Sequence, residues 1–193
     1  EADDDNVIPI LDGDWFTDDI SERFLQFVKL TFGDEYYEEN VQFIEDAIGK
    51  SIRKYFLKDF YTDHVQRYKK RPIYWMFSSS KGSFQALIYM HRYKSDTVSV
   101  ILNDYLRDYI SKLEATKENL EAIGIKADAP KSEKVKALKE IEKIKKMIVE
   151  CEDYEKDILY PLATQKIEID LDDGVKVNYL KFGKALKKIV GLD

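Results

Sequence analysis

The feature that most constrains this chain is a pair of long helical patterns separated by a short break. Apolar residues recur at helical spacing from Val98 to Leu113 and again from Val135 to Cys151. That spacing places them on one face of each helix. The segment GIKADAP, residues 124–130, interrupts the pattern. Two helices of roughly 40 Å each, at 1.5 Å per residue, must then fold back on one another. We therefore predict an antiparallel coiled-coil hairpin over residues 95–160.

The first third of the chain predicts short helices. Residues 17–33 start with Thr17 as a possible N-cap and end at Gly33, and residues 34–49 repeat the scheme. A third helix is expected over residues 51–68. The apolar positions expected to face inward in the first two helices are Ile20, Phe24, Phe27, Val28, Tyr37, Val41, Ile44 and Ile48.

Between these helices and the long hairpin, the pattern changes to strands. PIYWMF (72–77) and FQALIYM (84–90) are rich in β-forming residues and flank the turn SSSKGS. This predicts an antiparallel β-hairpin in which Tyr74 and Trp75 face opposite sides, so at most one of them lies in the core. Apolar residues alternate around DDG in residues 166–180, which predicts a second hairpin, followed by an amphipathic helix over 183–190.

The predicted fold class is therefore α+β and mainly α. It has a helical N-terminal part, a central β-hairpin, a long antiparallel coiled-coil hairpin and a small C-terminal β-hairpin. We expect three units: residues 1–94, 95–160 and 161–193.

Charge is unevenly distributed along the chain. Residues 1–49 hold fifteen acidic and two basic residues, whereas residues 50–94 hold eleven basic and two acidic ones. The basic third is expected to meet an anion, which is either nucleic acid or the acidic first third itself.

Several chemistries lack their motifs. One cysteine and two histidines do not make a zinc site, and no glycine is spaced for a phosphate-binding P-loop. IDLDDG fails the EF-hand spacing, because the sixth position counted from Asp170 is Val175. DNA amino-methyltransferases need an Asn/Asp-Pro-Pro-aromatic loop, and all four prolines are isolated. We expect no catalytic, metal or cofactor site in this chain.

Other features bear on where the chain works. The lone Cys151 is compatible with a reducing cytoplasm, and no apolar run reaches the roughly 18 residues that span a bilayer. The chain starts at Glu1, and we expect it to be a piece of a longer protein.

Basic and hydroxyl side chains around the central hairpin are candidates for double-stranded DNA binding. Paired strands bring Arg71 and Arg92 to one end and Lys81 to the other, which could straddle a phosphate backbone. The predicted contacts are Arg67, Lys69, Lys70, Arg71, Ser79, Lys81, Arg92 and Lys94. The alternative is a half-buried sheet with a solvated rim.

The segment RPIYWMFSSSKGSFQALIYMHRYKSDTVSVILNDYLRDYI, residues 71–110, resembles the C-terminal region of the large adenine-specific DNA methyltransferase of type 1 bacteriophage-exclusion (BREX) systems. Residues 6–24, 52–75 and 169–186 resemble the same family in the same order, and the ends of type IIG restriction–modification proteins are similar more loosely. The resemblance implies a parent enzyme that transfers a methyl group from S-adenosylmethionine to the N6 of adenine. It implies that the catalytic and cofactor residues lie upstream, in another domain of the same protein.

Two functions follow as hypotheses. The first is a non-catalytic domain that recognises or positions DNA. The second is a protein-interaction module that docks other BREX proteins or the methyltransferase core through the long hairpin.

Overall fold

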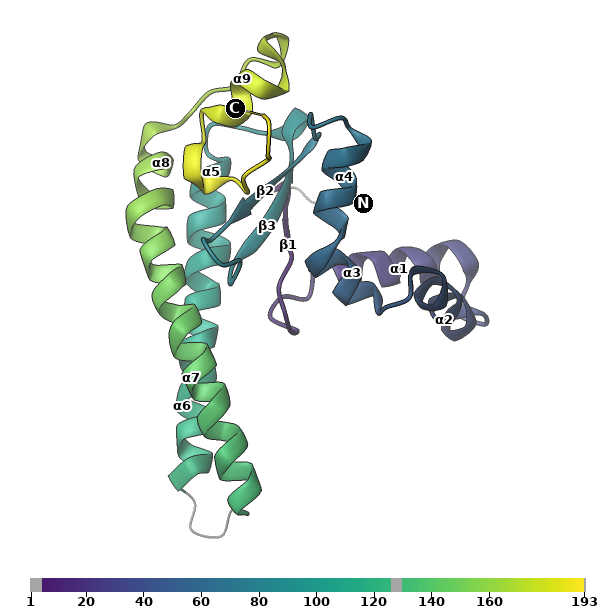
Figure 1. Ribbon diagram of the computed structural model, residues 1–193, viewed down its shortest axis with the longest axis vertical. Helices are drawn as coiled ribbons and strands as arrows, with labels where there is room; N and C mark the ends of the chain where they lie inside the picture. Colours follow the sequence, from purple (N-terminus) through teal and green to yellow (C-terminus); the bar gives the residue numbers. More distant parts are fainter. Residues whose placement is uncertain (1–4, 126–129, 193) are drawn as a thin grey trace.

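A three-stranded antiparallel sheet organises the fold, with helices on both of its faces (Figure 1). The computed structural model describes residues 5–125 and 130–192. The strands are β1 (Val7–Pro9), β2 (Tyr74–Ser78) and β3 (Gln85–Tyr89), in the order β1-β3-β2. The predicted central hairpin is confirmed, with Tyr74 opposite Tyr89 and Ser78 opposite Gln85. β1 was not predicted from the sequence.

Both faces of the sheet are buried, which explains the dense apolar composition of its strands. Trp75 and Phe77 point into the larger cluster, formed with the long helices and the C-terminal segment. Met76 and Leu87 point the other way, toward a smaller cluster that includes Tyr61. Successive side chains alternate between the two faces, as the strand period requires.

Four helices precede β2 in the chain. They are α1 (Ile20–Phe32), α2 (Tyr37–Ile48), α3 (Ile52–Lys58) and α4 (Phe60–Arg67). α1 starts after Asp19, whose side chain accepts hydrogen bonds from two backbone N–H groups, so the prediction of Thr17 as N-cap was wrong. The single helix predicted over 51–68 is divided at Asp59 into α3 and α4.

The inward face predicted for α1 and α2 is only partly correct. Val28 is buried, but Phe27 is exposed. α2 contributes no buried residue: Tyr37, Val41, Ile44 and Ile48 are only half-buried.

Two long helices pack side by side and antiparallel, as predicted (Figure 1). The first runs through α5 (Thr97–Val100), a π-helical stretch (Ile101–Leu106) and α6 (Arg107–Ile125). The second runs through α7 (Lys131–Tyr154), a π-helical stretch (Glu155–Leu159) and α8 (Tyr160–Gln165). Residues 126–129 of the predicted connection lie outside the described residues.

The C-terminal part corrects the prediction most strongly. Residues 166–180 do not form a hairpin: they contain a 3₁₀ turn (Leu171–Asp173) and helix α9 (Gly174–Leu180). Asp170 and Asn178 cap this turn and helix from within, through bonds to the Asp172 N–H and to the Asp170 and Gly174 carbonyls. These local side-chain bonds favour the helical turn over strand pairing.

The amphipathic helix predicted over 183–190 is also wrong. After a single 3₁₀ turn (Gly183–Ala185), the chain extends along the free edge of β2. The Lys187 N–H donates to the Met76 carbonyl at 2.8 Å. The extended segment thereby satisfies backbone groups that an exposed edge would leave unpaired.

Within the described residues, none of the helices combines the length and apolar character needed to cross a membrane.

Candidate nucleic-acid interface

The serine-rich turn between β2 and β3 binds an anion that belongs to the protein itself. One carboxylate oxygen of Glu150, on α7, accepts the backbone N–H of Lys81 at 2.6 Å. The other oxygen accepts the Ser83 hydroxyl at 2.5 Å. Glu150 is only 8% exposed. The turn therefore ties the central hairpin to the long helices.

The surroundings of Glu150 favour its charged form. Burial by itself raises the pKa of the carboxyl, but hydrogen bonds from Ser79, Ser83 and two backbone N–H groups outweigh burial and lower it. Ser79 is buried, and its hydroxyl also accepts the Phe84 N–H at 3.0 Å. Because this hydroxyl is buried and already hydrogen-bonded within the protein, we do not include Ser79 in the proposed DNA-binding surface.

The outer side of the same turn borders a cleft of 930 Å³ between α3 and α7. Its lining is strongly basic, with Asp12, Glu142 and Glu150 as the acidic members. The lining lysines are Lys54, Lys58, Lys81, Lys139, Lys143, Lys146 and Lys187.

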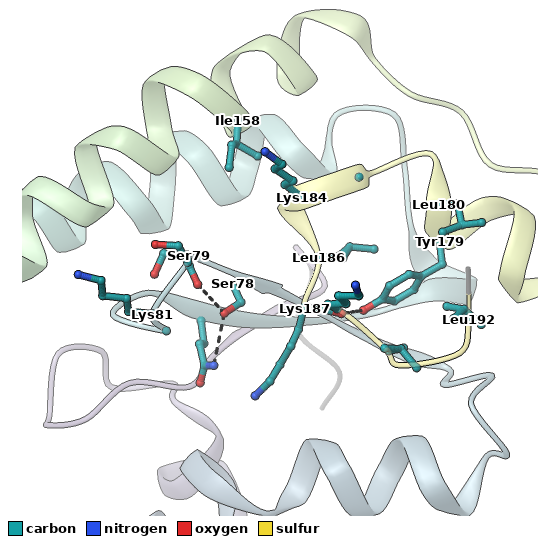
Figure 2. A pocket seen from close by; sticks show the side chains of 16 residues that line it. Ser78, Ser79, Lys81, Ile158, Tyr179, Leu180, Lys184, Leu186, Lys187 and Leu192 are labelled. Carbon is teal, nitrogen blue, oxygen red and sulfur yellow. Dashed lines mark hydrogen bonds between the residues drawn. The ribbon is translucent and has the colours of Figure 1, made fainter.

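A second hollow of 640 Å³ extends this cleft under the C-terminal segment (Figure 2). The two share Lys81, Gly82, Gln85 and Lys187 in their linings, so they adjoin each other. The second hollow adds Lys184 and Lys188 to the basic lining. We call the nine lysines of the two hollows the cleft lysines.

The positive charge of this cleft is largely unmatched. Among the described residues, Lys143 is the cleft lysine that reaches carboxylates, with Glu140 at 3.5 Å and Asp12 at 3.8 Å. Lys187 is half-buried, and both burial and the nearby Lys58 lower the pKa of its ammonium group. The electrostatic repulsion between two neighbouring ammonium groups is offset when an anion binds between them.

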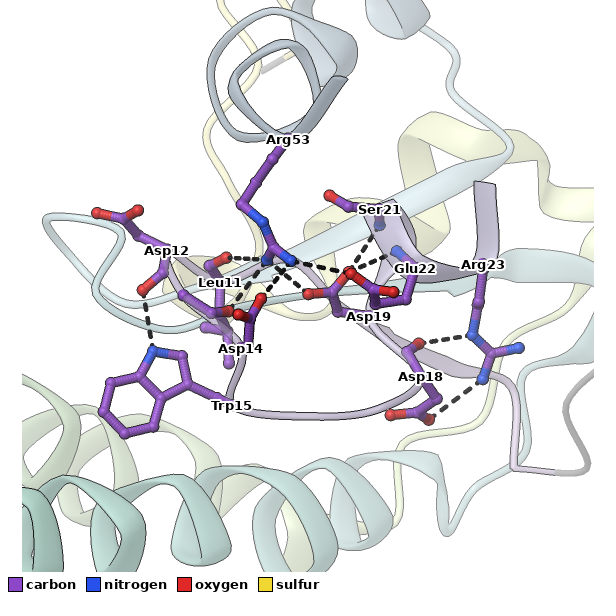
Figure 3. Close-up of polar contacts among 11 residues, drawn as sticks. Leu11, Asp12, Asp14, Trp15, Asp18, Asp19, Ser21, Glu22, Arg23 and Arg53 are labelled. Atoms are coloured by element: carbon purple, nitrogen blue, oxygen red, sulfur yellow. Dashed lines mark hydrogen bonds and ion pairs between the residues drawn. The ribbon is translucent and has the colours of Figure 1, made fainter. Parts of the chain in front are cut away.

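Arg53 also lines the cleft, but its positive charge is neutralised by carboxylates of the protein itself (Figure 3). Its guanidinium contacts Asp19 at 2.7 Å, Asp14 at 2.6 Å and Glu22 at 3.3 Å, and donates to the Gly13 carbonyl at 3.0 Å. The same Asp19 caps α1. We call these four charged residues the Arg53 cluster. At this one arginine, acidic residues of the first third neutralise a charge of the basic third.

The structure does not bring the sequence-predicted residues into one surface. Lys81 lies in the cleft, at the end of the hairpin opposite Arg71 and Arg92. Arg67 ends α4, and Lys69, Lys70 and Arg71 follow it in a tight turn with φ of 51° at Lys69 and 63° at Lys70; all four are exposed.

Two further predicted residues, Arg92 and Lys94, line a separate small pocket beside Asp5 and Asp96. Within residues 5–125 and 130–192, none of the seven predicted basic side chains forms an ion pair.

Sequence reasoning missed most of the cleft lysines, although a signal was present. Lys139, Lys143 and Lys146 lie at steps of four and three on α7, and Lys54 and Lys58 lie four apart on α3. Each set shares one helix face. That these faces border one cleft depends on how α3 and α7 pack around the turn.

Comparison with known proteins identifies relatives of this chain. No family model matches it. It is 37% identical over 203 aligned positions to the adenine-specific methyltransferase BrxX of Escherichia coli O9:H4 (strain HS), covering 97% of this chain. It is 38% identical over 188 positions to the adenine-specific methyltransferase PglX of Lacticaseibacillus casei (strain Zhang), covering 92% of this chain.

The predicted resemblance to adenine-specific methyltransferases is thereby confirmed. The chain spans 16% of the length of each of these two curated relatives. It is homologous to one segment of them.

Proposed function

We propose that this chain is a non-catalytic DNA-positioning segment of an adenine-N6 DNA methyltransferase in a BREX phage-defence system. The parent enzyme uses S-adenosylmethionine, which binds in an upstream domain, and works in the cytoplasm. The observation that carries the proposal is the pair of adjoining hollows lined by nine lysines, of which all but Lys143 lack a carboxylate partner within the described residues.

Lysine is suited to this role because its ammonium group contacts phosphate as a point charge, without reading base edges. The cleft lysines come from α3, the serine-rich turn, α7 and the C-terminal segment, so a bound backbone would touch four parts of the chain. Duplex DNA held in this way is oriented for a catalytic domain that reads the target adenine.

The exposed basic residues beyond the cleft extend the proposed contact surface. The proposed phosphate contacts at the other end of the sheet are Arg67, Lys69, Lys70 and Arg71 at and after the end of α4, and Arg92 and Lys94 after β3. Removing any one contact is expected to weaken binding to all sequences alike and to lower the salt slope by about one.

The test is fluorescence anisotropy of the chain with labelled duplex DNA over a series of salt concentrations. We expect Lys58→Glu with Lys146→Glu to weaken binding about 100-fold near 100 mM salt, because two contacts become repulsive. Lys131→Glu with Lys156→Glu is the matched control, since it makes the same charge change at exposed positions outside the cleft, on the long helix that also carries Lys146.

Each other outcome has a clear meaning. If Lys70→Glu with Arg71→Glu weakens binding more than the cleft pair, the DNA path lies at the other end of the sheet. If all three pairs weaken binding equally, net charge and not the cleft is responsible. If the wild-type chain does not bind near 50 mM salt, the DNA-positioning proposal fails.

The second candidate function is a protein-interaction module. α7 exposes Val135, Leu138 and Val149 to the extent of 45%, 60% and 56%. Such side chains could dock other BREX proteins or the methyltransferase core. Replacing Leu138 with Ser should then reduce assembly of the parent protein, measured by analytical ultracentrifugation, without changing DNA affinity.

A further inference from the structure

The helix pair α1–α2 presents an apolar surface that this chain leaves uncovered. Phe27 and Leu30 of α1 are 58% and 80% exposed, and Phe43 of α2 is 73% exposed. Phe32 and Tyr36, at the connection between the helices, are more than half exposed as well. A monomeric protein seldom concentrates large apolar side chains in one exposed region unless that region binds something.

Packing within the chain does not explain why α2 is present. No residue of α2 is buried, and the pair projects to one side of the sheet, away from the long helices (Figure 1). Its base is nevertheless held firmly. Glu45 accepts the Ile52 N–H at 2.9 Å, Lys50 contacts Asp59 at 2.7 Å, and Arg53 holds the start of α1. The pair is therefore an anchored element with a free apolar face.

The charges around this face restrict what can cover it. Acidic residues are frequent in the connection and in α2, which carry part of this face, and Lys29 is already paired with one of them, at 3.0 Å. The acidic residues of the connection and of α2 are Asp34, Glu35, Glu38, Glu39, Glu45 and Asp46. Nucleic acid would be repelled, and a second copy of this face would bring two acidic rims together. The complementary partner is apolar with a basic rim.

We propose that α1–α2 docks onto the part of the parent polypeptide that lies outside the region represented by this chain. The curated relatives are far longer, since the matched segment is 16% of each. A covalently linked partner has a high effective concentration, so a modest apolar face is sufficient to hold it. The surface is separate from the cleft lysines, and this docking does not require DNA binding.

Hydrogen–deuterium exchange, read by mass spectrometry, tests the docking. The exchange of α1–α2 peptides is compared between this chain alone and the full-length parent protein. We expect at least tenfold slower exchange in the parent, because docking suppresses local opening of a helix with no buried side chain. Leu30→Gln with Phe43→Gln in the parent should restore the fast exchange. Leu171→Gln with Val177→Gln, at exposed apolar positions at and before α9, is the matched control and should not.

The proposal is overturned if α1–α2 exchanges equally fast in both proteins. It is also overturned if the isolated chain becomes protected as its concentration rises and sediments as a dimer, because a second copy is then the occupant. DNA affinity of the isolated Leu30→Gln, Phe43→Gln chain should equal that of wild type. A failure of docking is thus distinguishable from a failure of the DNA-positioning proposal.

Discussion

The Arg53 cluster and the cleft lysines lie next to each other, yet they handle positive charge in opposite ways. Arg53 is surrounded by three carboxylates and a backbone carbonyl. Lys58 and Lys187 both line the cleft, close enough for their charges to interact, and in the described part of the chain neither has a carboxylate partner. A count of charges along the sequence treats Arg53, Lys58 and Lys187 alike. Their surroundings give Arg53 a structural role, whereas the charges of the two lysines remain available to bind an anion.

Glu150, which lines the same cleft, is a negative charge whose partners are also supplied by the protein. Its carboxylate is enclosed by donors from the serine-rich turn. The turn that looked suited to a phosphate is thus already occupied by an internal anion. The comparison teaches that a charged or polar motif offers a binding surface only if the fold has not already supplied its partner.

The largest expected effect is in the Arg53 cluster. Arg53→Ala leaves the buried Asp19 without its cation, and we expect the free energy of unfolding to fall by about 2–4 kcal/mol. Urea denaturation of both proteins measures this. Lys58→Ala on the same helix is the control and should change stability by less than about 0.5 kcal/mol. If both substitutions lower the free energy of unfolding equally, the Arg53 cluster and the cleft lysines do not differ in how their charges are matched.

A smaller loss is expected at Glu150. Glu150→Gln keeps the size of the side chain but removes its charge, and should cost about 1–3 kcal/mol near neutral pH because charged hydrogen bonds are lost. Because the fold lowers the pKa of this carboxyl, its contribution is present above the ordinary value of 4.5 and is lost as the pH falls further.

Unfolding measured from neutral to acidic pH checks this sign. The difference between wild type and Glu150→Gln should narrow as the carboxyl becomes protonated. A difference that stays constant or widens toward acid would show that the charge of Glu150 is not what the turn stabilises.

The smallest effect concerns the ammonium groups of the cleft. Lys58→Met should raise the pKa of Lys187, because a neighbouring positive charge is removed while burial remains. Duplex DNA should raise it in the wild-type chain as well, by placing phosphate between the two. Both shifts are measurable by NMR titration of isotopically labelled lysines. A pKa of Lys187 that does not respond to DNA would place the bound backbone elsewhere.

Local patterns predicted the elements whose period is unambiguous. The two long helices and the central hairpin were predicted because their apolar spacing matches only one kind of structure over many residues. Residues 166–180 were mispredicted because Val175, Val177 and Tyr179 fit both an alternating strand and part of a short helix. The side-chain bonds of Asn178 decided between the two.

The order of the residues was sufficient to predict where most helices and strands form, how charge is divided along the chain, and which protein family it resembles. Which charges are matched depended on how the chain folds. Arg53 meets carboxylates more than 30 positions away, and the turn at Lys81 meets Glu150 across 69 positions. Backbone periodicity acts between near neighbours in the chain, whereas Coulomb attraction and hydrogen bonding depend on distance in space. The cleft and the residues that line it therefore exist only once the chain has folded.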